Sequence, residues 1–206
     1  MIRTLFAAIA ALILAGAASA QDVRITPDMP RAEFTIRGEQ VVIERIQDLD
    51  NTITGGFAKT SRQCPPFCIH AMSAGPGVET VGELELIAFL ADHVEPGTGL
   101  LIDSRLPEFY VQGTIPGSVN LPFSTMEATN PYRDEILSAL GGQKSGDTWD
   151  FSGAMELLAF CNGPWCDQSP RMIRNMLEVG YPAEKLRYYR GGMQMWLLLG
   201  LSVNVP

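Results

Sequence analysis

The chain has 206 residues, 46% of them hydrophobic, and a formal net charge of −8. This length and apolar content suffice for one hydrophobic core and a small appendage. The excess of acidic residues argues against nucleic acid or an anionic membrane as a partner.

The first 20 residues have the pattern of a signal peptide. Arg3 precedes an apolar run over residues 5–14, and Ala18-Ser19-Ala20 supplies the small residues that signal peptidase accepts. We therefore expect cleavage after Ala20, a mature start at Gln21, and a periplasmic or secreted protein. The residue after the cut is not cysteine, and no later apolar run approaches the roughly 20 residues that span a bilayer. No membrane attachment is expected after cleavage; an uncleaved anchor is the alternative.

Residues 21–77 are predicted to form an N-terminal extension. Apolar and polar residues alternate on both sides of Gly38 between residues 31 and 48, which indicates a β-hairpin after an extended leader. Two prolines fix the backbone of the later segment 64–68, so this segment is a rigid loop. The extension is too small to form its own core, and we expect it to lie against the following domain.

Residues 78–206 alternate between strand-like and helix-like segments. Short apolar runs at 99–103, 118–121, 157–160 and 186–189 predict buried strands. Helices are expected from Thr80 as N-cap, after Asn130-Pro131, from Ser169 and after Gly191-Gly192, whereas residues 144–154 are expected to form a polar loop. This alternation predicts an α/β fold with a parallel sheet and helices on both faces. Ligands bind such sheets at the carboxyl ends of the strands.

Cys161 follows the third of these strands and precedes a tight loop and a helix. Free backbone amides and the positive dipole at a helix start stabilise an anion, so the pKa of Cys161 is expected below the usual value of about 8.5. Cys161 would then be a nucleophile whose sulfur adduct the amides of residues 162–167 could bind. A buried structural cysteine before an ordinary turn is the alternative.

Several motifs in order resemble the rhodanese-like sulfurtransferases. The resemblance covers residues 78–203 and rests on Asp103-Ser104-Arg105, Gly113 through Pro122, Phe160-Cys161, and Tyr181-Pro182 followed by Arg190-Gly191-Gly192 and Trp196.

This resemblance implies one rhodanese-like domain in which Cys161 accepts a sulfane sulfur as a persulfide. Its active-site loop would consist of Cys161 and the residues that follow it, which are Asn162, Gly163, Pro164, Trp165, Cys166 and Asp167. Related phosphatases of the same fold use a longer loop that ends in an arginine, which holds the phosphate. This chain has Asp167 there, so the cation that phosphatase chemistry requires is absent from the loop. Asp103 and Arg105 correspond to a structural pair in the family, with a lesser role for Arg105 in orienting an anionic donor.

Three features depart from the family's pattern. Thr114 stands where the family commonly has histidine before Ile-Pro-Gly, and Cys166 occupies a position that is usually small or apolar. The active-site loop also contains no cation, which argues against thiosulfate as the preferred donor.

The additional cysteines leave several hypotheses open. Cys166 could attack a persulfide or sulfenic acid on Cys161, or only pack beneath the helix. Cys64 and Cys68 could form a disulfide, which an exported protein favours, or act as a redox partner of Cys161. Binding of zinc or an iron–sulfur cluster by all four is a further alternative, but the spacings are unusual for it, so neither a metal nor a cofactor is expected.

From the sequence we predict an exported sulfurtransferase with Cys161 as its nucleophile. Its partners would be a sulfane-sulfur donor and a thiol acceptor, either a small molecule or a protein. The alternatives are a thiol–disulfide oxidoreductase that uses Cys161 with Cys166 or the Cys64/Cys68 pair, and a non-catalytic binding module.

Overall fold

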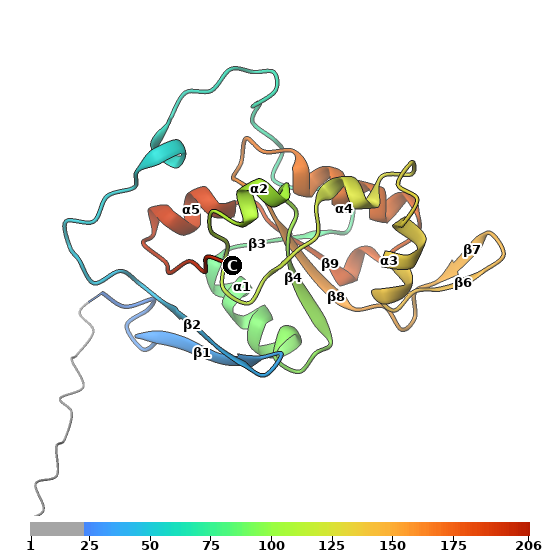
Figure 1. Cartoon of the computed structure of the whole chain (residues 1–206), viewed down its shortest axis with the longest axis horizontal. Helices are drawn as coiled ribbons and strands as arrows, with labels where there is room; N and C mark the ends of the chain where they lie inside the picture. The colour runs from blue at the N-terminus through green and yellow to red at the C-terminus, as the bar shows by residue number, and fades with distance from the viewer. Residues whose placement is uncertain (1–22) are drawn as a thin grey trace, which may run out of the picture.

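A five-stranded parallel sheet forms the centre of the molecule (Figure 1). The computed structural model describes residues 23–206, so the predicted signal peptide and the predicted mature start at Gln21 lie outside the described residues. The strand order is β3-β9-β8-β4-β5. These strands comprise β3 (Glu79–Val81), β4 (Gly99–Asp103), β5 (Val119–Asn120), β8 (Glu156–Phe160) and β9 (Leu186–Tyr189).

Helices cover both faces of this sheet. Successive side chains of a strand point to opposite faces, so the continuous apolar strands place apolar side chains on both faces. Leu158 and Phe160 of β8 face a cluster that includes α1 (Glu83–Phe89), the π-helical turn η2 (Leu90–Val94) and α5 (Gly192–Leu198). Leu157 and Ala159 face the opposite cluster, which includes η3, α3 and α4. The elements on that second face are η3 (Phe123–Met126), α3 (Arg133–Ala139) and α4 (Gln168–Glu178). The α/β prediction with helices on both faces is confirmed.

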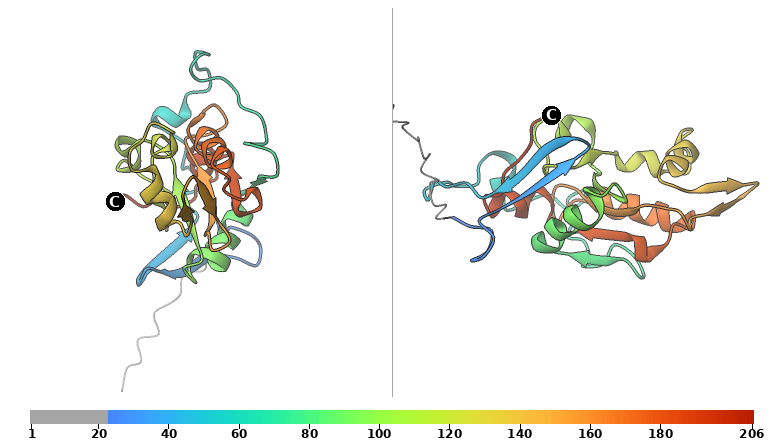
Figure 2. Two further views of the ribbon diagram at one scale, coloured as in Figure 1. Left: turned by 90° about the vertical axis from the view of Figure 1, so that its right-hand side faces the viewer. Right: turned by 90° about the horizontal axis from the view of Figure 1, so that it is seen from below.

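The predicted N-terminal hairpin is present and packs against the domain. It consists of β1 (Arg31–Ile36) and β2 (Glu39–Glu44), which pair antiparallel. Phe34, Ile36 and Ile43 are buried in the same cluster as α1 and α5, and Figure 2 shows the hairpin beside α1. The hairpin therefore contributes to the hydrophobic core.

Two local predictions were wrong. Thr80 is not a helix cap; it lies in β3, pairs with Tyr188, and donates its hydroxyl to the Met72 carbonyl. A three-residue strand is too short for an alternating pattern to reveal it. The predicted polar loop 144–154 contains a hairpin, made by β6 (Gln143–Ser145) and β7 (Thr148–Asp150) around Gly146, that projects from the body (Figure 1).

Three short helical segments complete the structure. They are η1 (Gly55–Ala58), α2 (Pro107–Tyr110) and η4 (Ala183–Lys185). No helix in the described part of the chain combines the length and apolar character needed to cross a membrane.

Candidate active site

Cys161 lies at the carboxyl end of β8, the middle strand of the sheet. The six-residue loop from Cys161 to Cys166 leads into α4, which begins at Gln168. The side chain of Cys161 is only 1% exposed. A cysteine in this position lies next to the free amides at the start of an eleven-residue helix.

The start of α5 holds the backbone of this loop. The amide of Met193 donates to the Cys161 carbonyl (3.0 Å), and the amide of Gln194 donates to the Asn162 carbonyl (2.9 Å). Gly192 makes this approach feasible: its φ is +56°, and a Cβ there would lie 2.4 Å from the Cys161 carbonyl oxygen. Glycine at position 192 is therefore required by close packing against the active-site loop.

Hydrogen bonding favours the thiolate form of Cys161. Burial opposes ionisation and would raise the pKa, but four donors outweigh it. They are the Cys166 thiol, the Ser169 hydroxyl, and the backbone amides of Ser169 and Gly163. The net effect lowers the pKa of Cys161 below that of an ordinary thiol, as expected from the sequence. In the thiol form, its sulfur lies 3.3 Å from the Cys166 carbonyl oxygen and can donate to it.

Ser169 is a site residue that sequence reasoning missed, since it was considered only as a helix start. Its side chain is fully buried, and apart from the Cys161 sulfur its hydroxyl has no hydrogen-bond partner within residues 23–206. A buried hydroxyl without an acceptor is unfavourable, and a thiolate or persulfide on Cys161 would supply that acceptor. The sequence shows a serine eight residues after Cys161, but it does not show that the serine hydroxyl points toward the cysteine.

Cys166 remains a thiol at the far end of the loop. It is buried, and its sulfur lies 3.8 Å from the Gln168 side-chain oxygen and 4.0 Å from the Asn162 side-chain nitrogen. Donation to Cys161, burial and the neighbouring charge raise the pKa of Cys166. The two thiols at the ends of the loop thus have opposite roles, one as the anion and the other as a donor to it.

Asp103 and Arg105 form a buried pair beside the loop. The Arg105 side chain is 2% exposed, and its Nη2 lies 2.6 Å from Asp103 Oδ2. Arg105 also donates to the Gly113 carbonyl at 2.7 Å and makes a long 3.5 Å contact with Asn162. The Thr114 hydroxyl donates to Asp103 at 2.7 Å. Thr114 therefore contributes a hydroxyl to this pair, where histidine is common in the family.

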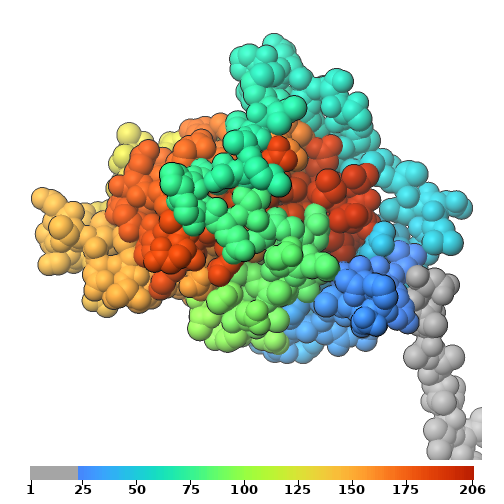
Figure 3. All heavy atoms as spheres, turned by 180° about the vertical axis from the view of Figure 1, so that it is seen from behind, coloured from blue at the N-terminus to red at the C-terminus, as the bar shows by residue number. Residues whose placement is uncertain are grey.

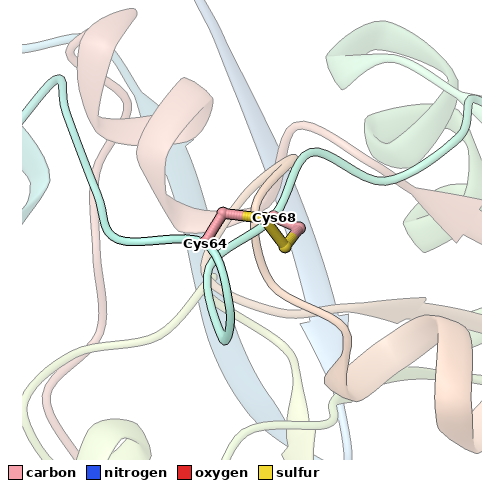
Figure 4. The surroundings of a disulfide bond; sticks show 2 residues. All are labelled: Cys64 and Cys68. Carbon is pink, nitrogen blue, oxygen red and sulfur yellow. A yellow bond between two sulfur atoms is a disulfide. The ribbon is translucent and has the colours of Figure 1, made fainter.

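A segment of the N-terminal extension lies over the active-site loop. Residues 54–70, here called the strap, contain the disulfide between Cys64 and Cys68, with 4.6 Å between the Cα atoms (Figure 4). This is the first of the alternatives given by the sequence, and it leaves neither residue as a free thiol beside Cys161. Figure 3 shows the chain around the strap, in teal, standing over the C-terminal elements in orange and red.

Trp165 is the point at which the strap contacts the loop. The Arg62 guanidinium lies 3.7 Å from the centre of the Trp165 ring, and the Phe67 ring meets it edge-on at 5.6 Å. Gln194 of α5 accepts a hydrogen bond from the indole and donates to the Phe57 carbonyl. At the last residue of the strap, the backbone amide of His70 donates a hydrogen bond to the Pro164 carbonyl of the loop (2.9 Å). Trp165 is therefore partly covered by this chain and not fully open to a partner.

The strap and the domain together enclose a pocket of about 430 Å³. Its wall includes Phe57, Arg62 and Phe67 from the strap, and Arg105, Asn162 and Trp165 from the domain. A smaller pocket of about 230 Å³ lies next to Cys166 and Asp167. Arg62 is the second residue that sequence reasoning missed, because only the folded chain brings residue 62 beside the loop.

The structure thus brings Cys161, Asn162, Gly163, Cys166 and the Asp103–Arg105 pair together. Cys64 and Cys68 lie in the strap and are bonded to each other. Within the described range, no group of three or more His, Cys, Asp and Glu side chains could hold a metal ion.

Comparison with known proteins places this arrangement in a family. Residues 87–199 match the family described as "Rhodanese-like domain". A curated relative from Mycobacterium tuberculosis, the HTH-type transcriptional regulator Rv0324, is 28% identical over 110 residues, which are 53% of this chain. The aligned stretch is 39% of that regulator's length, so this chain spans about two fifths of it.

Two solved structures are also similar. The human single-domain sulfurtransferase TSTD1 is 25% identical, with a TM-score of 0.39 over 58% of this chain and 96% of its own. The BH2092 protein of Bacillus halodurans is 15% identical, with a TM-score of 0.46 over 61% of this chain and 76% of its own. The match over residues 87–199 covers more than half of the chain, and the protein therefore belongs to the rhodanese-like domain family.

Proposed function

We propose that this protein is a sulfurtransferase that carries a sulfane sulfur as a persulfide on Cys161. The observation that supports this proposal most directly is the set of donors around the Cys161 sulfur. Two backbone amides and the otherwise unpaired Ser169 hydroxyl are directed at an anion on that atom. Backbone amides and a hydroxyl next to Cys161 would also stabilise a persulfide anion formed there.

The proposed reaction has two displacement steps. The Cys161 thiolate attacks the sulfane sulfur of a donor, the donor's own bond to that sulfur breaks, and the remainder leaves with the electron pair. An acceptor thiolate then attacks the outer sulfur of the persulfide, which restores the Cys161 thiolate and yields an acceptor persulfide. No net oxidant is required, and protons exchange only with the thiols.

Export to the periplasm or cell exterior remains part of the proposal. It rests on the signal-peptide pattern of residues 1–20, and the disulfide of the strap is of the kind that persists in oxidising compartments. The thiol acceptor, a small molecule or a protein, would then be an extracytoplasmic one.

Mass spectrometry without reductant tests the proposed chemistry. The protein is incubated with thiosulfate or an organic thiosulfonate, and the Cys161 peptide is expected to gain one sulfur atom. Cys161→Ser should gain none, whereas Cys166→Ser should still be loaded. If no donor adds sulfur to Cys161, the sulfurtransferase proposal is wrong.

A second candidate is a thiol–disulfide oxidoreductase, which the two free thiols of one loop support. Cys161 would attack an organic disulfide to form a mixed disulfide, and Cys166 would displace the second thiol and close an internal bond. This candidate would replace the first if the protein gained no sulfur and instead accumulated a Cys161–Cys166 disulfide in the presence of an organic disulfide.

A further inference from the structure

The charge of the large pocket is opposite to that of the protein as a whole. The chain has 23 acidic and 15 basic residues, yet the residues that line the 430 Å³ pocket include two arginines and no aspartate or glutamate. A positively charged wall in an acidic protein favours an anionic ligand.

The two arginines differ in how far their charges are already neutralised. Arg105 is paired with Asp103 at 2.6 Å and is almost fully buried, so its charge is offset within the protein. Arg62 donates to the Gly56 carbonyl at 2.7 Å and stacks on Trp165, and it makes no ion pair with a carboxylate of residues 23–206. Arg62 is therefore the cation of the pocket wall whose charge no carboxylate of residues 23–206 neutralises.

Arg62 also has an unused donor. Its Nε is buried and has no hydrogen-bond partner in the described part of the chain. A guanidinium offers a planar set of N–H donors that suits carboxylate, sulfonate and sulfinate oxygens. The active-site loop itself contains no cation, so the strap supplies the charge that this loop lacks.

The rest of the pocket wall is mainly apolar and suits the carbon part of an organic ligand. Phe57, Phe67 and Phe109 line it together with Trp165 and Met193, and much of this surface is apolar. An inorganic anion would leave these aromatic faces uncovered, whereas an organic group would bury them. Asn162, the neighbour of Cys161, lies in the wall of the same pocket.

We propose that the strap forms a donor-binding site in which Arg62 binds the anionic group of an organic sulfur donor and the aromatic wall holds its carbon part. This inference rests on the proposed function, since the sulfane sulfur of the donor must reach Cys161 past Asn162. For an organic thiosulfonate, the Cys161 thiolate bonds to the sulfane sulfur, the sulfur–sulfur bond of the donor breaks, and the sulfinate leaves with the electron pair beside Arg62.

Donor kinetics provide the first test. Benzenethiosulfonate, methanethiosulfonate and thiosulfate are compared for the rate at which they load Cys161. The wild-type protein should have a kcat/KM about tenfold higher for the benzene than for the methane compound, because the ring buries apolar surface. Phe109→Ala should reduce that preference without abolishing loading.

Variants of Arg62 test its role as the anion contact. Arg62→Gln should lower kcat/KM for each anionic donor about tenfold, mainly through KM, whereas Arg62→Lys should retain most of it. Lys59→Gln is the matched control, since Lys59 is an exposed cation of the same strap. Equal kinetics for Arg62→Gln and Lys59→Gln would overturn the inference and leave the proposed function intact.

Alkylation of Cys161 separates the two proposals, because it requires no sulfur transfer. Iodoacetate carries a negative charge and iodoacetamide does not. Arg62→Gln should slow the reaction with iodoacetate severalfold and leave that with iodoacetamide unchanged. If the ratio of the iodoacetate rate to the iodoacetamide rate is the same in wild type and Arg62→Gln, the role of Arg62 is overturned. If neither reagent alkylates Cys161, the pocket is not its access route.

Discussion

The rhodanese-like domain and the strap meet at the same loop but are built differently. The domain holds the Cys161 backbone through a main-chain bond from α5, and a buried ion pair lies beside the loop. The strap is largely exposed, and it contacts the loop through one main-chain bond, a stacked arginine and an aromatic edge. Under the proposed function, the domain would set the reactivity of Cys161 and the strap would control which donors reach it.

Disruption of the buried ion pair should have the largest effect. Asp103→Asn leaves the Arg105 charge buried without its partner, so the free energy of unfolding should fall by about 3–5 kcal/mol. Glu33→Gln breaks an ion pair between side chains about half exposed, and should cost about 0–1 kcal/mol. Chemical denaturation measures both. Similar losses for the two variants would mean that the Asp103 pair is not structural.

Gly192→Ala should be the next most damaging change. It combines a positive φ with a clash against the loop backbone, and should destabilise the protein by about 1–3 kcal/mol or more and displace Cys161. Gly146→Ala is a control with a similar φ of +59° and no atom within 4 Å of the added Cβ. The difference between their unfolding free energies isolates the contact with the loop. Equal losses would show that close packing at Gly192 is unimportant.

Ser169→Ala should change reactivity more than stability. Removal of a donor to the thiolate raises the pKa of Cys161, so the pH at which alkylation by iodoacetamide is half-maximal should move upward. The wild-type midpoint should lie below the value of about 8.5 for a free cysteine. Ser138→Ala, on the exposed side of α3, should leave the midpoint unchanged. A midpoint unaffected by Ser169→Ala would remove this hydroxyl from the site.

Loss of the strap disulfide should have the smallest effect on the domain. Cys64→Ser with Cys68→Ser opens a loop of only a few residues, so global stability should change little. The strap should become more mobile, and alkylation of Cys161 by iodoacetamide should accelerate a fewfold. An unchanged rate would show that the disulfide does not control access, and a large loss of stability would contradict the assignment of the strap as a peripheral segment.

Local sequence patterns predicted much of the domain. Runs of apolar residues at 99–103, 157–160 and 186–189 predicted β4, β8 and β9, because a buried parallel strand requires a short continuous apolar segment. The apolar run at 157–160 also predicted that Cys161 directly follows a buried strand. These features depend on neighbours in the chain, and local pattern therefore revealed them.

The contacts that complete the site join segments that lie far apart in the sequence. Arg62 and Trp165 are more than 100 residues apart, and no periodicity links them, yet their side chains stack. The same holds for Gly192, whose conformation makes sense only against the Cys161 carbonyl. Ser169 could be read as a helix start, but the fold directs its hydroxyl toward Cys161. Contacts between distant segments depend on how the whole chain packs, and for this reason the pocket was absent from the prediction, whereas the strand that precedes Cys161 was predicted.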